Sequence, residues 1–146
     1  MGEEFDLLLR KKGHLSRQRI FDWATKIIDV MRTMSSSQDE NTQLQIAMKV
    51  RTYIHEHLAE GISLQMIADH VGLHPVYLSK IYKTAMDETI GDYIYRYRMD
   101  RAAHLLRNTD MKVAEISSHL GYLATPHFIK IFKKHYGMTP QEYRGR

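Results

Sequence analysis

The chain has 146 residues, of which 43% are hydrophobic and 26% charged, and a formal net charge of +4. These values are typical of one globular domain, with or without an extension, rather than of a disordered chain. The sequence has no cysteine, which excludes disulfides, thiolate metal sites and cysteine nucleophiles. It also has no apolar run whose length approaches the about 20 residues of a membrane-spanning helix. We therefore expect a cytoplasmic protein that does not enter a membrane.

The surplus of positive charge lies at the end of the chain. Lys and Arg outnumber Asp and Glu only in residues 112–146, by six to two, whereas they balance at seven to seven in residues 1–41 and at eight to eight in residues 42–111. A basic surface on one element is typical of phosphate binding. A solvated cationic surface is the plainer interpretation of the same count.

Residues 1–41 are predicted to form a helical extension. From Arg17 to Met34 apolar residues recur at steps of three and four, which gives one face of an amphipathic helix. The polar run 35–41 predicts a linker. This helix has no core of its own, so we expect a signalling linker or a dimerisation arm that packs on the downstream domain, on a second copy or on another partner. Its apolar face consists of Ile20, Trp23, Ala24, Ile27, Ile28, Met31 and Met34.

A domain over residues 42–146 is predicted to follow, beginning with an amphipathic helix over residues 42–59. A short helix over residues 64–71 comes next, and Ser63 is a good N-cap for it, because its hydroxyl can accept a bond from a free backbone N–H. Gly72 permits the left-handed backbone that a tight turn requires. This is the pattern of the first helix and the turn of a helix-turn-helix unit.

A helix over residues 76–86 completes the first unit, at about residues 63–86, and is its candidate reading helix, the one that enters a DNA major groove. Leu78, Ile81 and Tyr82 recur at helical spacing and are expected to face the core. An exposed aromatic, a serine and lysines suit contact with base edges and phosphates, whereas the plainer interpretation is a packed tyrosine and solvated lysines. The outward residues are Val76, Tyr77, Ser79, Lys80 and Lys83.

A longer helix is predicted over residues 90–107, with Thr89 and Asp92 forming a capping box at its start. At about 1.5 Å per residue it is about 27 Å long, and successive major-groove faces on one side of B-DNA lie about 34 Å apart. The helix is therefore a rigid spacer suited to two reading helices. Arg98 and Arg101 fall within its apolar stripe, where an arginine can snorkel to solvent, pair with a carboxylate such as that of Glu115, or reach a phosphate. For Arg98 we expect the ion pair.

The helix-turn-helix pattern occurs a second time, at about residues 112–135. Residues 64–72 match residues 113–121, and after the turn residues 77–83 match residues 127–133. The offset thus changes from 49 to 50, so the second turn is one residue longer than the first. Such self-similarity is evidence of a duplicated supersecondary unit.

The second reading helix is predicted to begin at Thr125. His127 can donate or accept a hydrogen bond, and Lys130 can reach the acceptors of guanine. The core face is predicted to consist of Phe128, Ile131 and Phe132. The side chains left to face outward are Thr125, His127, Lys130, Lys133 and Lys134.

Two groups of residues carry a resemblance to a known family. The late group is Gly121-Tyr122, Phe128, Phe132-Lys133-Lys134, Gly137, Thr139-Pro140 and Tyr143-Arg144, and the spacer group is Tyr97-Arg98, Ala102 and Leu105-Leu106. With them, residues 47–146 resemble the DNA-binding domain of the AraC/XylS family of transcription regulators. The resemblance implies an all-α fold, in which two helix-turn-helix subdomains are joined by a long spacer helix, here preceded by an N-terminal helical extension.

The resemblance also implies a function, that of a sequence-specific transcription regulator that binds double-stranded DNA, with both reading helices in successive major grooves of a promoter site. By position it assigns base contacts to Val76, Ser79, Lys80, Pro126, His127 and Lys130. It implies RNA polymerase as a partner and a larger sensor- or receiver-linked regulator, of which this chain is the effector part. We further expect a homodimer through the N-terminal helix.

Some positions depart from the family pattern. Asp87 stands where a glycine usually closes the first reading helix, although aspartate tolerates left-handed geometry better than most residues. Lys112 stands at the usual small N-cap, for which Asp110 is expected to substitute. Pro126 has no N–H and no polar group, so it is expected to contact a thymine methyl group rather than to form a hydrogen bond. The second unit is then expected to clamp phosphate more than it reads sequence.

An enzyme is not expected. The sequence has no metalloprotease HExxH motif, no phosphate-binding glycine loop and no nucleophile elbow. Its nine histidines form no i,i+4 pair within one predicted helix, so neither a metal nor a cofactor is expected. The alternative function is a helical protein-interaction module with only non-specific DNA affinity. That alternative predicts weak, salt-labile binding without sequence preference, whereas a DNA reader predicts a large specificity ratio.

Overall fold

The computed structural model describes residues 17–146, except for the side chains of residues 33–37, and it divides the chain into two compact units, Met1–Asn41 and Thr42–Arg146. The part of the predicted extension that falls on residues 1–16 lies outside the described residues. All of the described elements are helices, so the predicted all-α fold is confirmed. They are α2 (Arg17–Glu56), α3 (Leu64–Val71), α4 (Pro75–Met86), α5 (Ile90–Asn108), α6 (Val113–His119), α7 (Thr125–Tyr136) and α8 (Pro140–Arg144).

The predicted linker over Ser35–Asn41 is wrong, because these residues continue α2, which runs from Arg17 to Glu56. The segment is polar but contains neither glycine nor proline. Serine, asparagine and aspartate lower helix stability by at most about 0.7 kcal/mol per residue, far less than proline does. A polar run without a helix breaker therefore does not end a helix. Within residues 17–146, no helix is long and apolar enough to cross a membrane.

In Thr42–Arg146, the last turns of α2 pack with α3, α4 and α5 around a core that helical spacing predicts well. Leu78, Ile81 and Tyr82 are buried there as predicted, together with Val50 and Ile54 of α2 and Leu58, which follows α2. Tyr53 is also buried, although its spacing did not single it out. Its ring stacks on that of His57, with centroids 4.1 Å apart, so an aromatic pair closes the end of this core.

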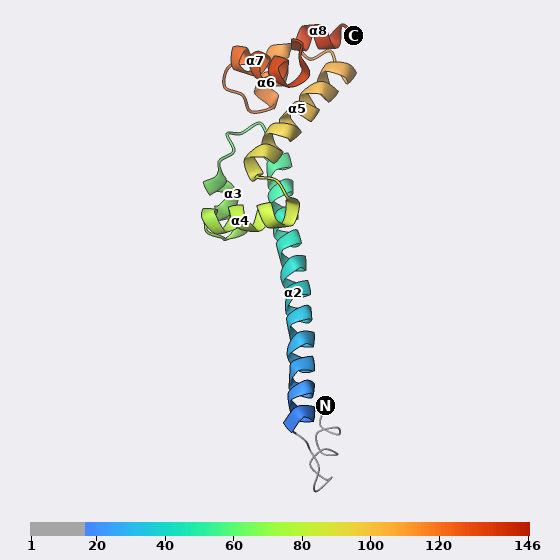
Figure 1. The fold of residues 1–146 in the computed structure, drawn as a ribbon. Coiled ribbons are helices and arrows are strands. Elements are labelled where there is room, and N and C mark those ends of the chain that lie inside the picture. Colours follow the sequence, from blue (N-terminus) through green and yellow to red (C-terminus); the bar gives the residue numbers. More distant parts are fainter. Residues whose placement is uncertain (1–16) are drawn as a thin grey trace. The chain divides into compact units, whose positions relative to one another are not determined.

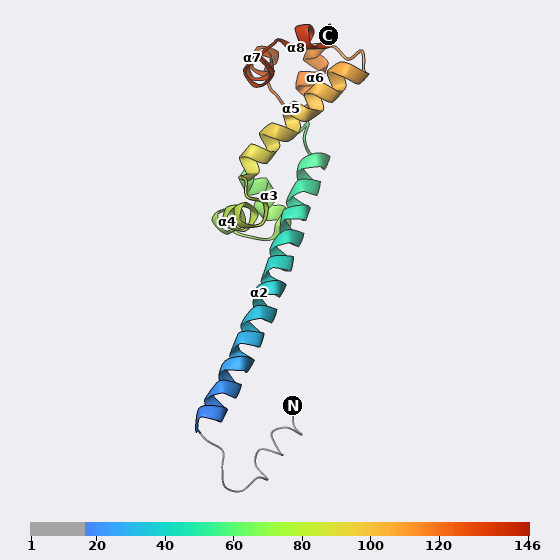
Figure 2. The same ribbon diagram turned by 45° about the vertical axis from the view of Figure 1, so that its right-hand side comes forward.

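Helix α5 joins the two helix-turn-helix subdomains, with α3 and α4 at its N-terminal end and α6, α7 and α8 at its C-terminal end (Figures 1 and 2). It has 19 residues, which corresponds to about 28 Å. At its start, the Thr89 hydroxyl accepts a bond from the backbone N–H of Asp92 at 3.0 Å, and the return bond of the predicted capping box is not formed. The predicted spacer helix is confirmed, and it extends one residue further than expected.

The C-terminal end of α5 is fastened by α8. The Arg144 guanidinium donates hydrogen bonds to the carbonyl oxygens of Leu106, Thr109 and Met111. A cation at this end also complements the helix dipole. At the start of α8, a capping box forms in both directions between Thr139 and Glu142.

The expected ion pair of Arg98 is wrong. Its guanidinium lies over the ring of Tyr122, 5.1 Å from the centroid, and it pairs with no carboxylate in the described part of the chain. Burial raises the pKa of Tyr122, so a neutral aromatic ring holds the cation. Glu115 is engaged elsewhere, because its carboxylate accepts a bond from the backbone N–H of Lys112 at 3.2 Å. Lys112 is itself the N-cap residue of α6, so the expected substitution by Asp110 is also wrong.

Gly121 permits a close contact between the second subdomain and the segment after α2. It lies in the turn between α6 and α7 with φ of 85°. A Cβ atom at this position would collide with the carbonyl oxygen of Leu58 and would lie 3.1 Å from Nη2 of Arg98. Two separate reasons therefore require glycine here: the left-handed backbone conformation, and the lack of space for a Cβ atom.

Candidate nucleic-acid interface

Local caps fix the geometry of the first reading helix, α4. The hydroxyl of Ser63 caps α3 as predicted, accepting a bond from the N–H of Met66 at 3.2 Å. Gly72 has a φ of 76°, which gives the tight turn between α3 and α4. The ring of His74 then caps α4, because its Nδ1 accepts a bond from the N–H of Val76 at 3.3 Å.

The end of α4 confirms the expectation for Asp87. This residue adopts a left-handed conformation, with φ of 56°, at the position where a glycine was expected from the family pattern. Its backbone N–H bonds to the carbonyl oxygen of Lys83 at 2.9 Å and so closes the last turn. The first reading helix thus begins and ends at defined residues.

The outward face of α4 carries the five residues predicted for the first unit. Val76 and Tyr77 are 60% and 57% exposed, although both are large and hydrophobic, and Ser79 is half-buried. Lys80 and Lys83 are exposed and line, together with Ser79, a shallow groove of about 700 Å³ between α4 and the start of α5. The structure therefore brings these residues together on an accessible face, and their contact with DNA stays a prediction.

The second reading helix, α7, presents its predicted residues in the same way. Phe128 and Phe132 are fully buried, and Ile131 is half-buried against the same core. Thr125 is half-buried at the start of the helix. The exposed side chains of the predicted set are Pro126, His127, Lys130, Lys133 and Lys134.

The lysines of both reading helices are electrostatically available. None of Lys80, Lys83, Lys130, Lys133 and Lys134 forms an ion pair with a described residue. The last turn of α7 contains Lys133, Lys134 and His135, at the negative end of the helix dipole. An unpaired lysine is a point charge that can neutralise a phosphate and release its counterions.

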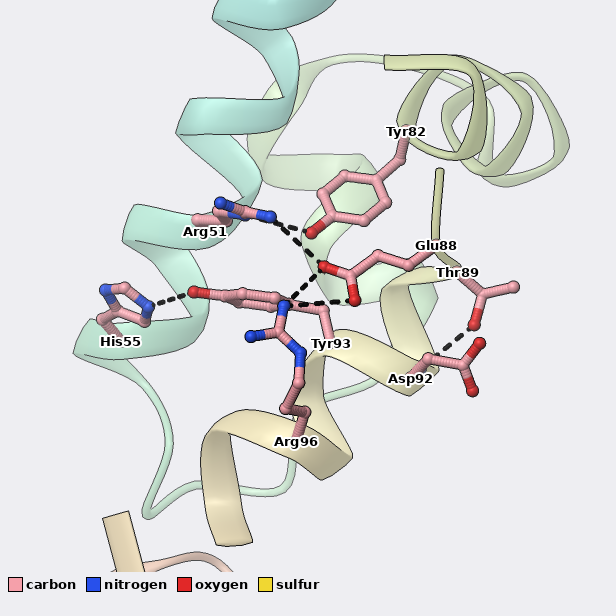
Figure 3. Close-up of polar contacts among 8 residues, drawn as sticks. All are labelled: Arg51, His55, Tyr82, Glu88, Thr89, Asp92, Tyr93 and Arg96. Carbon is pink, nitrogen blue, oxygen red and sulfur yellow. Dashed lines mark hydrogen bonds and ion pairs between the residues drawn. The ribbon is translucent and has the colours of Figure 1, made fainter. Parts of the chain in front are cut away.

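A polar cluster behind α4, which sequence reasoning missed, fixes the end of the reading helix (Figure 3). Arg51 of α2 donates from Nε to the Tyr82 hydroxyl and from Nη2 to Oε1 of Glu88, each at 3.2 Å. Arg96 of α5 donates from Nη2 to both carboxylate oxygens of Glu88, at 2.8 and 3.1 Å. Glu88 comes directly after Asp87, the C-cap of α4, so the two arginines tie the end of α4 to α2 and α5.

Aromatic rings complete this cluster (Figure 3). The Arg51 guanidinium lies 4.5 Å from the centroid of the Tyr93 ring, and the hydroxyl of Tyr93 lies 2.6 Å from Nε2 of His55. Burial, followed by the charges of Arg51 and Arg101, lowers the pKa of His55. The hydrogen bond to Tyr82, the largest influence, raises the pKa of Arg51. The cluster therefore holds a fixed arginine next to a neutral imidazole at pH 7.

Comparison with known proteins shows which family the sequence matches. Residues 67–146 match the family model of the helix-turn-helix domain. Regulatory protein PocR of Salmonella typhimurium LT2 is 38% identical over 96 residues, which cover 66% of this chain and 32% of PocR. Regulatory protein SoxS of Escherichia coli K12 is 32% identical over 94 residues, which cover 64% of this chain and 88% of SoxS.

Longer relatives and solved structures agree with this match. The xylose operon regulatory protein of Escherichia coli K12 is 33% identical over 147 residues. The chain spans about a third of the length of this relative and of PocR, 36% and 32% respectively. The C-terminal domain of AraT, a response regulator from Geobacillus stearothermophilus, is similar over 68% of this chain and 83% of its own, with a TM-score of 0.64 and 32% identity. The chain thus belongs to the AraC/XylS family of helix-turn-helix, DNA-binding transcription regulators.

Proposed function

We propose that the chain binds double-stranded DNA sequence-specifically, with α4 and α7 in successive major grooves on one face of a promoter site. The observation that carries the proposal is the pair of exposed, lysine-bearing helices at the two ends of α5 (Figures 1 and 2). The length of α5, about 28 Å, is close to the about 34 Å between major-groove faces one helical turn apart. The family consists of DNA-binding regulators, which are not enzymes.

The two reading helices, α4 and α7, make different kinds of contact with DNA. The outward face of α4 offers hydrogen-bonding groups, in Tyr77, Ser79 and Lys80, that suit the acceptors and donors of base edges. The outward face of α7 offers mostly charge, with three exposed lysines, and in its first turn Pro126 has no hydrogen-bonding group, which leaves His127 as the exposed donor or acceptor. The first unit therefore supplies most of the sequence recognition, and the second supplies most of the phosphate contacts.

Selection of bound duplexes from a random library at near-physiological salt, followed by sequencing, tests this function. Two enriched blocks with centres about 10 base pairs apart are the expected result. A single block would mean that one unit alone reads sequence, which we expect to be the first. The absence of enrichment, with weak and salt-labile binding, would favour the protein-interaction module and overturn the proposal.

Three further expectations belong to the same proposal. In the cell, this segment is the DNA-binding end of a longer regulator, as the greater lengths of PocR and the xylose operon regulatory protein suggest. It acts in the cytoplasm, where it contacts RNA polymerase at the promoter. It dimerises through α2, whose first half exposes Ile20, Ile28 and Met31. Sedimentation of the chain and of Ile28→Asp tests the last point, because a monomeric wild type would exclude this dimer.

A further inference from the structure

Leu123 is the extra residue of the second turn. The bond from the N–H of Leu73 to the carbonyl oxygen of Ala68, 3.0 Å long, recurs in the second unit between Tyr122 and Ser117 at 3.0 Å. Leu73 and Tyr122 thus occupy the same place, and both are half-buried against the core.

The reading helices resume in register on the other side of the inserted residue. The carbonyl oxygen of His74, the N-cap of α4, accepts from the N–H of Leu78 at 2.9 Å, and that of Ala124, the N-cap of α7, accepts from the N–H of Phe128 at 3.3 Å. Leu123 alone lies between the two matched sets, so it has no counterpart in the first unit.

The inserted leucine contributes nothing to the core. Leu123 is fully exposed, more so than any other large hydrophobic residue in the described part of the chain. A single exposed leucine is ordinary on a protein surface. Its position is what gives it a role, because only the N-cap residue Ala124 separates it from α7, and residues at the N-terminal end of a recognition helix are those that contact base edges.

Two apolar residues, Ala124 and Pro126, lie close to Leu123 at this end of α7, where they alternate with the polar Thr125 and His127. Ala124 and Pro126 are both exposed, and Ala124 makes no side-chain capping bond, whereas the equivalent His74 presents a ring nitrogen to α4. Further along α7, the unpaired Lys130, Lys133 and Lys134 match the charge of a DNA backbone. The 5-methyl group of thymine is the apolar feature that the major groove displays.

We propose that Leu123 is a specificity-determining residue that packs on thymine 5-methyl groups in the half-site bound by α7. The proposal rests on the proposed function and deepens it. The second unit then has a sequence preference of its own, and the preference is for a methyl group rather than for a hydrogen-bonding pattern. Leu123 acts on the base edge and not on phosphate, so it contributes specificity without salt dependence.

Replacement of single thymines by deoxyuridine in the selected duplex is the test, because it removes the methyl group and nothing else. Affinities of the full chain are measured at constant salt for each substituted duplex. We expect a loss of about fourfold at one or two positions of the second block, which corresponds to about 0.8 kcal/mol for one buried methyl-sized group. Leu123→Ser should bind the thymine and uracil duplexes equally, and Leu123→Met should restore the difference.

Matched variants separate Leu123 from its neighbours. Val76→Ala, in the first unit, should leave the uracil sensitivity of the second block as it is in the wild type. The salt dependence of Leu123→Ser should equal that of the wild type, and its thermal unfolding should be unchanged, because the side chain is exposed. Uracil sensitivity that survives in Leu123→Ser and disappears in Pro126→Ala would assign the contact to Pro126 and overturn the proposal.

Two other results would also overturn it. One is a second block without thymine, and the other is a wild type that binds every uracil duplex as well as the thymine duplex. In both cases specific binding to a selected site would still support the proposed function. A failure of the proposed function itself looks different, because selection then enriches no block at all.

Discussion

Replacement of Gly121 by alanine should lower the free energy of unfolding more than the same change at Gly72. Both glycines have a left-handed backbone, with φ of 85° and 76°, so both variants incur the about 1–2 kcal/mol of strain of an L residue in that region. At Gly72 the new Cβ meets no atom within 4 Å, whereas at Gly121 it collides with the backbone carbonyl oxygen of Leu58. Overpacking of this kind adds about 1–3 kcal/mol. We therefore expect a loss of about 2–5 kcal/mol for Gly121→Ala and about 1–2 kcal/mol for Gly72→Ala.

Urea unfolding followed by circular dichroism measures both values, and Gly137→Ala serves as a second control. Gly137 also has a φ of 76° and open space around its Cβ position. The free energy of unfolding is obtained by linear extrapolation, and unchanged m-values establish that the variants unfold from equally compact states. Equal losses at all three glycines, within the error of the extrapolation, would refute the close contact between the second turn and the segment after α2.

The remaining predictions concern DNA binding and pH. Lys80→Ala should cost about 1–3 kcal/mol on the selected site and less on random DNA, and an equal loss on both in titrations would assign Lys80 to phosphate. Lys133→Ala should lower the slope of log K against log salt by about 0.9 and leave the order of preferred sequences unchanged, and an altered order would assign it to a base. The lowered pKa of His55 means that the unfolded chain binds the proton more tightly, so stability should fall as pH drops below 6.5, the ordinary pKa. His55→Gln should weaken this dependence in urea titrations at pH 5 and pH 7.5, and an equally steep dependence in the variant would place its origin elsewhere.

The elements of the fold could be predicted because their signals are local. Ser63, Gly72 and Asp87 act within a few residues of their own positions, and the buried faces of α4 and α7 follow from helical spacing. The duplication also made the family assignment possible, and that assignment is confirmed. The candidate DNA contacts on α4 and α7 lie on the outward faces that helical spacing predicts, and their contact with DNA stays a prediction.

Interactions between distant residues could not be predicted in the same way. Arg51 and Glu88 are 37 residues apart, so no periodicity relates them. The charge of Arg98 favours an ion pair, but its guanidinium lies over the ring of Tyr122 instead. The linker predicted over Ser35–Asn41 is wrong for a different reason, because polarity alone does not end a helix where no residue breaks it.

The bonds of Arg51 make the first reading helix sensitive to torque on α2. Successive residues of a helix point about 100° apart, so a twist of α2 by a single residue step would remove Arg51 from Glu88 and bring Val50 or Thr52 to that side. The carboxylate would then keep only Arg96, and Tyr82 would lose its bond to the guanidinium. A rotation of α2 about its axis would therefore loosen the end of α4, even if the length of α2 did not change.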